Sequence, residues 1–132
     1  MGSRREGREA AVQFLFNRDL DPELTTEQFA AFFEFRRAKG EARDFAISRI
    51  EGFLDREPMI DKVISDSLEN FEFDRLAVVD RNILRIAVFE MEYDKDVPPP
   101  VAINEAIEVA RRLSTEDSAR FVNGVLDRIA KA

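Results

Sequence analysis

Apolar residues recur along most of the chain at the three- and four-residue spacing of α-helices, and no segment shows the alternation of a β-strand. One clear stripe, at i, i+3, i+4, i+7 and i+11, consists of Ile60, Val63, Ile64, Ser67 and Phe71. Residues 73–93 indicate a short helical turn followed by a long helix, in which only Arg85 and Glu90 are charged between residues 83 and 91. A helix that is apolar nearly all round is usually central. The pattern predicts an all-α fold of about seven helices.

Proline, glycine and capping residues mark where the helices of the first half begin and end. The first helix is expected over residues 4–20, because Pro22 holds the residue before it outside the helical region. A second helix begins at a capping box of Thr25 and Gln28 and ends before Gly40, where a left-handed residue is needed. Its four phenylalanines between residues 29 and 35 are assigned to the core rather than to base stacking, with Phe35 as the most exposed.

Similar signals divide the second half. Pro58 fits the first turn of a helix, where its missing N–H is not needed. The three prolines at 98–100 favour an extended polyproline segment, followed by a helix over residues 101–113. A last helix is expected to start at Ser114, with Asp117 completing its capping pattern.

Composition narrows the function. A length of 132 residues predicts one domain, and with 45% apolar and 36% charged residues the chain is expected to be compact and soluble. It has no apolar run that could span a membrane, no signal peptide and no cysteine, so we expect a cytoplasmic protein. Without cysteine or histidine there is no thiolate or imidazole zinc site and no Ser-His or Cys-His nucleophile. No phosphate-binding glycine loop is present, and the 27 acidic residues are assigned to solvated helix faces. We therefore expect no enzyme, no cofactor and no metal.

Three segments go beyond generic helical periodicity. They are RREGREAAVQFLF, VVDRNILRIAVFEME and VPPPVAINEAIEVARRLSTEDSARFVNGVLDRI, starting at residues 4, 78 and 97. VAINEAIE followed about twenty residues later by FVNGVLD is the most specific feature. The chain resembles the NusB family of bacterial transcription antitermination factors, although residues 21–57 carry no signature of it. The resemblance implies a single RNA-binding domain over residues 1–132, built of two helical subdomains at about 1–57 and 58–132.

The resemblance also implies partners. NusB-like proteins pair with NusE, a protein of the small ribosomal subunit, and the pair binds boxA-type single-stranded RNA. It thereby helps the RNA polymerase antitermination complex to read through terminators, notably in ribosomal RNA operons. Members of the family are monomers or homodimers. Two alternatives are the NusB-like domain of a ribosomal RNA methyltransferase, which needs a following nucleotide-fold domain beyond Ala132, and a helical protein-binding adaptor without RNA binding.

The resemblance assigns RNA contact to the arginine-rich start, Arg4, Arg5 and Arg8. Their three- and four-residue spacing allows them to share one helix face. Each guanidinium can grip a phosphate or stack on a base. The structural alternative is that Arg5 pairs with Glu9 at i+4.

Further positions carried over near RNA are Phe16, Asp117 and Phe121. Phe16 stands where the family often has a tyrosine, so it lacks that hydroxyl. Asp117 can instead serve the first turn of its helix, because an acid there favours the helix dipole. Phe121 lies beside the apolar stripe of its helix, which predicts partial exposure.

The start of the long helix, with Asp80, Arg81 and Arg85, corresponds to the region where the NusE and RNA surfaces meet. The structural alternatives are that Asp80 caps this helix and that Arg85 is held by an acid of another helix. Asn104 and Asn123 have no role that we can assign, except that a buried amide would satisfy backbone groups. Gly124 is expected to let two helices approach closely.

Charge is distributed unevenly. Residues 1–18 contain four arginines and two glutamates and so carry a net charge of +2. Because the whole chain has a net charge of −7, the remaining residues carry −9. Such a body repels RNA at long range. If the run neutralises about three phosphates, the salt slope is only roughly −2. We therefore expect that a basic partner completes the RNA site.

Overall fold

The computed structural model describes residues 2–25, 27–28, 31 and 40–132. Within these ranges every regular element is a helix, which confirms the all-α prediction. In chain order the elements are α1 (Ser3–Leu20), α3 (Glu41–Leu54), α4 (Glu57–Asp66), the 3-10 turn η1 (Phe73–Arg75), α5 (Val78–Tyr93), α6 (Pro99–Leu113) and α7 (Glu116–Lys131). The phenylalanines at 29, 32, 33 and 35 lie outside the described residues.

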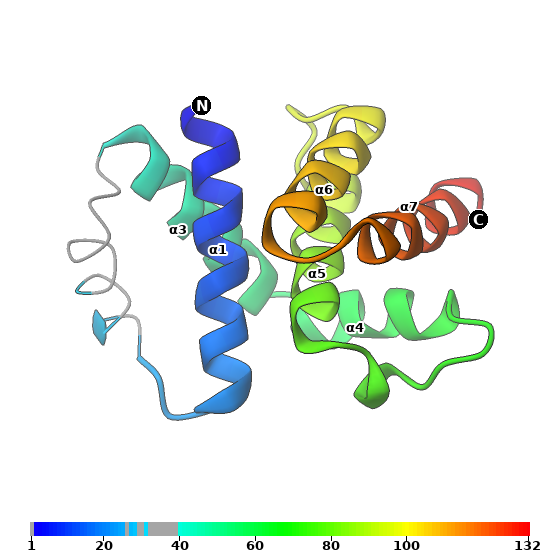
Figure 1. Cartoon of the computed structure of the whole chain (residues 1–132). Helices are drawn as coiled ribbons and strands as arrows, with labels where there is room; N and C mark the ends of the chain where they lie inside the picture. The colour runs from blue at the N-terminus through cyan, green and yellow to red at the C-terminus, as the bar shows by residue number, and fades with distance from the viewer. Residues whose placement is uncertain (1, 26, 29–30, 32–39) are drawn as a thin grey trace.

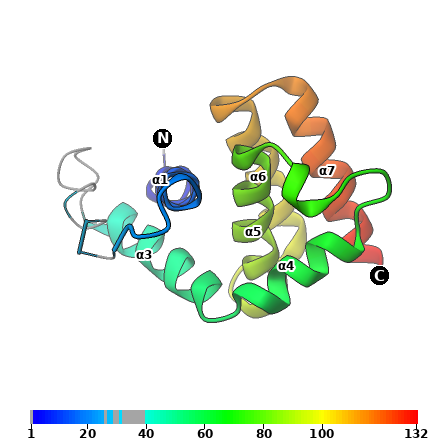
Figure 2. The same cartoon turned by 90° about the horizontal axis from the view of Figure 1, so that it is seen from below.

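The long helix α5 is the centre of the fold. Figures 1 and 2 show α1 and α3 on one side of it, and α4, α6 and α7 on the other. Every residue from Asn82 to Glu90 is buried, as the mostly apolar sequence of this helix predicts. One apolar cluster runs through both sides and takes side chains from α1, α3, α4, α5, α6 and α7. The packing of α5 therefore decides how α1 sits relative to α6 and α7.

Several predicted helix ends are confirmed. The Thr25 N–H donates to Oε1 of Gln28 at 2.8 Å, and the Gln28 N–H donates to Oγ1 of Thr25 at 3.2 Å, which is the reciprocal capping box. Gly40 has the positive φ expected of it, +60°, and precedes α3, whereas the end of the second helix predicted before it lies outside the described residues. Pro58 lies in the first turn of α4.

Three predicted ends are wrong. Helix α4 stops at Asp66, so Phe71 lies in the following loop with 59% of its surface exposed. Pro99 and Pro100 are not extended but form the start of α6. A helix tolerates prolines there because the residues of its first turn donate no N–H within the helix. The N-cap of α7 is Thr115 rather than Ser114, and its Oγ1 accepts the Ser118 N–H at 3.0 Å.

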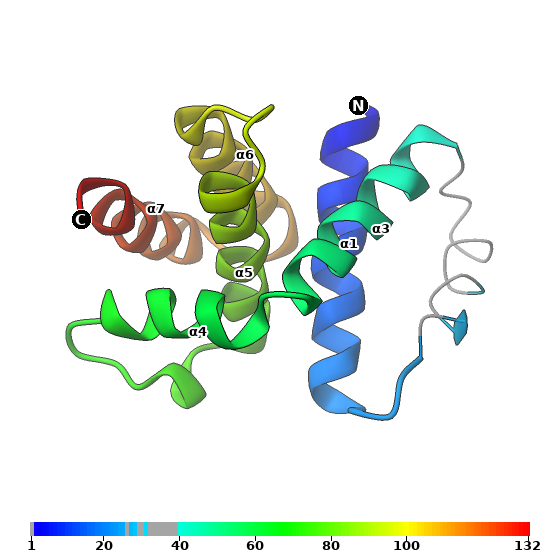
Figure 3. The ribbon, with the colours of Figure 1, turned by 180° about the vertical axis from the view of Figure 1, so that it is seen from behind.

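Two glycines that the sequence did not single out allow close packing. Seen from behind, α3 crosses α1 (Figure 3). A Cβ on Gly7 would lie 2.8 Å from the carbonyl oxygen of Ala42, and one on Gly52 would lie 2.2 Å from Cζ of Phe89. A Cβ on Gly124 meets nothing within 4 Å, so the close approach expected there is wrong. Within the part of the chain that is described, no helix has both the length and the apolar character needed to cross a membrane.

Candidate nucleic-acid interface

The arginine run occupies the first turns of α1, but its members differ in exposure. Arg4 is exposed, Arg5 is half-buried and Arg8 is buried, with 4% of its surface exposed. The Phe45 ring of α3 lies beneath them, and its centroid is 5.7 Å from Cζ of Arg4 and 4.9 Å from Cζ of Arg8. Arg49 stacks on the same ring at 4.1 Å. An aromatic face near a guanidinium stabilises it, so Phe45 supports Arg4 and Arg8 of the run.

Arg8 holds α1 against α5. Its Nε and Nη2 donate to the two carboxylate oxygens of Glu90, each at 2.8 Å, and Glu90 is 1% exposed. Nη1 of Arg8 donates to Oε1 of Glu105 on α6 at 3.4 Å. On the other side of Glu90, Nη1 of Arg49 lies 3.8 Å from it and also pairs with Asp94. Arg8 therefore does not share an exposed face with Arg4 and Arg5, because acids of two other helices enclose it.

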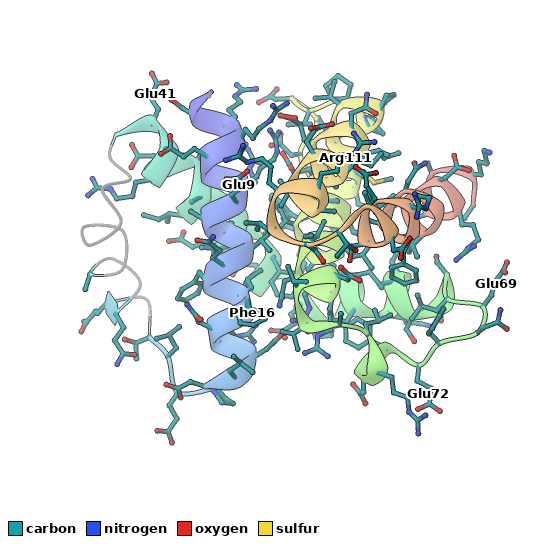
Figure 4. The ribbon with its side chains drawn as sticks, viewed as in Figure 1. Glu9, Phe16, Glu41, Glu69, Glu72 and Arg111 are labelled. Carbon is teal, nitrogen blue, oxygen red and sulfur yellow. The ribbon has the colours of Figure 1, made fainter. Side chains whose placement is uncertain are left out.

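Arg5 pairs across helices rather than along its own. Its Nη2 and Nε donate to Oε2 of Glu105 at 2.8 and 3.3 Å. The hydrogen bond and the charge of Glu105 raise the pKa of Arg5, so this side chain keeps its charge. Glu9, the partner expected from sequence, lies on α1 toward α6 (Figure 4) and pairs with Arg112 instead. The structural alternative of an Arg5–Glu9 pair is therefore not found, although Arg5 does pair with an acid.

The predicted cations of α5 are engaged in a cluster at the other end of α1. Oδ2 of Asp19 accepts from Arg81 at 3.0 Å, from Asn82 at 2.9 Å and from Arg85 at 3.1 Å. Arg85 also donates to both oxygens of Asp61 on α4, each at 2.9 Å. The structural alternative, that acids of other helices hold Arg85, is confirmed. Burial alone would raise the pKa of Asp19, but the Asn82 hydrogen bond and the two guanidinium charges outweigh burial and hold the pKa low.

A cavity of about 290 Å³ lies between the start of α7 and the segment that leads into α5. Its lining consists of Phe71, Arg75, Leu76, Ala77, Asp80, Thr115, Asp117, Ser118 and Phe121. The cavity thus brings together Asp117 and Phe121 of α7, Asp80 of α5, and Phe71, which the sequence did not assign to the site.

Asp80 is the buried acid of this cavity, with 8% of its surface exposed. It is not the cap of α5, since Ala77 occupies that position. Its Oδ1 has no hydrogen-bond partner among the described residues. Burial raises the pKa of Asp80, and a hydrogen bond with the Ser118 side chain offsets part of this rise. The carboxylate is therefore an acceptor that lacks a full set of donors.

Phe121 and Phe71 form the aromatic wall. Their ring centroids are 5.6 Å apart at an interplanar angle of 79°, an edge-to-face pair. Phe121 is half-buried, as expected. Asp117 is exposed in the first turn of α7 and pairs with Arg120. Sequence reasoning missed Phe71 because its spacing assigned it to the buried stripe of α4.

The remaining candidates lie apart from the cavity lining. Phe16 is half-buried on α1 (Figure 4). Asn104 and Asn123 are exposed, so the buried-amide explanation offered for them does not hold. Sequence reasoning also missed Glu90 and Glu105 as partners of the arginine run. For Glu90 the only signal was an acid on a helix predicted to be mostly apolar, and Glu105 had no signal.

These features define an all-helical protein in which a basic helix start and an aromatic-lined cavity are arranged around one buried helix. The family model described as the NusB family matches residues 5–131, and the chain belongs to that family.

Two relatives match over nearly their whole length. The transcription antitermination protein NusB of Desulfotalea psychrophila is 41% identical and is matched over 98% of this chain and 96% of its own length. The NusB protein of Myxococcus xanthus is 38% identical over 100% of this chain and 97% of its own.

Solved structures agree. NusB of T. maritima has a TM-score of 0.86 at 42% identity, covering 97% of this chain and 90% of its own. A crystal structure of the antitermination factors NusB and NusE in complex with dsRNA has a TM-score of 0.89 at 30% identity, covering 99% and 98%.

Proposed function

We propose that this protein is a transcription antitermination factor that binds boxA-type RNA together with NusE. In this role it helps RNA polymerase to read through terminators, notably in ribosomal RNA operons. The observation that carries the proposal is the likeness, over 99% of the chain, to a NusB solved with NusE and dsRNA. Such a factor acts by binding, so the proposal requires no catalytic group.

The chemistry of the interface supports contact with RNA. Arg4 and Arg5 offer guanidinium N–H groups to phosphates, whereas Phe71 and Phe121 offer aromatic surface to a base. Asp80 lines the cavity, and its carboxylate is suited to a base amino group and unsuited to a phosphate because it is itself acidic. We therefore expect sequence-tolerant contacts on α1 and base contacts at the cavity.

Charge supports a shared site. Residues 1–18 carry a net charge of +2 and the rest of the chain carries −9. Arg8 is buried, so it does not add to the exposed positive charge. We therefore propose that a basic NusE supplies the remaining positive charge, and that the isolated chain binds RNA weakly at physiological salt.

Fluorescence anisotropy with a labelled boxA RNA, with and without NusE, tests this function. We expect tight binding only with both proteins, loss of affinity in Phe121→Ala, and little binding of a scrambled RNA. Lys131→Gln, which removes one exposed charge near the end of α7, is the control and should bind as the original chain does. The absence of RNA retention even with NusE refutes the function.

A protein-binding adaptor without RNA contact is the second candidate. It is favoured by one observation, that Arg5 and Arg8 are both already engaged with acids. NusE binding in the anisotropy samples, monitored by light scattering, combined with no RNA retention and no effect of Phe121→Ala, would support the adaptor instead.

A further inference from the structure

Two ion pairs join α1 and α6, and each helix supplies the cation of one pair and the acid of the other. Arg5 of α1 donates to Glu105 of α6, and Arg112 of α6 donates through Nε to Glu9 of α1. We call these four residues the α1–α6 seam. Their side chains are unequally exposed: 39% for Arg5 and 49% for Arg112, against 17% for Glu105 and 12% for Glu9. The cations therefore face solvent and the acids lie beneath them.

Each guanidinium of the seam keeps a free edge. Arg112 uses Nε for Glu9, and the described residues provide no partner for its Nη1 or Nη2. Arg5 uses Nε and Nη2 for Glu105 and has no such partner for Nη1. A guanidinium has five N–H donors in a fixed fork. An acid that holds one edge thus orders the side chain in advance and leaves the other edge for a second anion, which lowers the entropic cost of binding.

Arg112 also stands between the two parts of the interface. Its partner Glu9 lies close enough to Arg5 to act on that side chain through its charge. In the other direction, α6 ends at Leu113 and Thr115 already lines the cavity. Figure 4 shows Arg111, the neighbour of Arg112, at the end of α6 that leads into α7.

We propose that Arg112 binds an RNA phosphate beside the one held by Arg5, so that the RNA backbone crosses the α1–α6 seam between the arginine run and the cavity. This inference rests on the proposed function and adds a contact residue outside the arginine run. The sequence resemblance did not assign Arg112 any contact.

A purely structural role for Arg112 makes a different prediction. A cation in the last turn of a helix interacts favourably with the helix dipole, but Arg111 occupies the same turn and pairs with Glu108 and Glu116. The Arg112–Glu9 pair is about half exposed on its cationic side, and such pairs contribute little to stability. If the pair served only to tie α1 to α6, then removing either partner would have the same effect.

The test uses the complex with NusE and a labelled boxA-type single-stranded RNA, with affinity measured from about 50 to 200 mM salt. Arg112→Gln is expected to bind roughly fivefold more weakly, with a salt slope smaller in magnitude by about 0.7, because one phosphate contact is lost. Glu9→Gln keeps an oxygen that accepts from Nε but removes the charge beneath Arg112. It is expected to bind equally or more tightly, with a steeper salt slope. Lys131→Gln is the matched control for one lost positive charge on an exposed pair.

Thermal unfolding of both variants accompanies the binding curves. Similar unfolding temperatures, with weaker RNA binding by Arg112→Gln and equal or tighter binding by Glu9→Gln, support the proposal. Equal weakening by Arg112→Gln and Glu9→Gln overturns it in favour of a structural pair, and unchanged binding by Arg112→Gln overturns it as well. If the original complex does not bind RNA, the proposed function itself fails, and the contact fails with it.

Discussion

The buried pair of Arg8 and Glu90 is the contact whose removal should change stability most. Two hydrogen bonds of 2.8 Å join a guanidinium that is 4% exposed to a carboxylate that is 1% exposed. Arg8→Met keeps much of the apolar stem and removes the charge, so Glu90 remains buried without its main partner. Breaking one side of a buried pair typically costs about 3–5 kcal/mol.

The surroundings place the effect at the lower end of that range. Arg49 lies 3.8 Å from Glu90 and continues to offset part of its charge, so we expect a loss of about 3 kcal/mol. For 132 residues the unfolding entropy is about 0.28 kcal/mol/K, which converts this loss to a fall in Tm of about 10 °C. In the double variant Arg8→Met with Glu90→Met neither charge is left alone, and Arg49 retains Asp94. The double variant should therefore be more stable than Arg8→Met alone.

Urea and thermal unfolding, both followed by circular dichroism, measure the differences in free energy of unfolding and in Tm. Arg5→Met is the matched control, because it makes the same change one turn earlier, in a pair whose cation is 39% exposed, and it should lower Tm only slightly. The reasoning is refuted if Arg8→Met is no more destabilising than Arg5→Met, or if the double variant is less stable than Arg8→Met by the full effect of a second, independent loss.

Three further predictions concern packing and pH. Gly52→Ala should destabilise the fold by about 1–3 kcal/mol, because the added Cβ would lie 2.2 Å from Cζ of Phe89. Gly124→Ala should instead stabilise α7 by about 0.5–1 kcal/mol, because its Cβ would meet nothing within 4 Å. Thermal unfolding of the two variants side by side compares them. The folded-state pKa of Asp19 lies below its usual 3.8, so its ionised form stabilises the fold above about pH 4, and that contribution is lost as pH falls through the folded-state pKa. Asp19→Asn should be less stable than the original chain at pH 7, and the difference should shrink as the pH is lowered below 4. The pKa of Asp80 is raised by burial, so its ionised form destabilises the fold as pH rises. Asp80→Asn should therefore be more stable than the original chain at pH 7 and no more stable near pH 3. A gain in stability that persists in acid would contradict this assignment.

Local signals were enough to locate most helices and several of their ends. The box of Thr25 and Gln28 and the first-turn Pro58 involve contacts within a few residues, so the sequence contains all that determines them. The errors occur where two local structures suit the same residues. Three consecutive prolines fit both an extended segment and the first turn of a helix, and here Pro99 and Pro100 belong to α6. Phe71 fits the spacing of α4, but the helix ends five residues earlier and leaves the ring beside Phe121.

The interface was harder to predict because its decisive contacts join distant parts of the chain. Helical spacing places Arg5 and Arg8 on one side of α1, but it cannot show that Glu90, 82 residues away from Arg8, buries one of them. This burial has a functional consequence. Because Arg8 fixes α1 against α5 and also reaches Glu105 on α6, it sets the position in which Arg5 and Arg112 face solvent across the seam. The buried member of the run thus determines where its exposed neighbours can meet an RNA backbone, so a substitution at Arg8 should weaken RNA binding through the arrangement of α1 rather than through a lost phosphate contact. Such a variant should lose affinity without a change in salt slope, which separates it from Arg112→Gln.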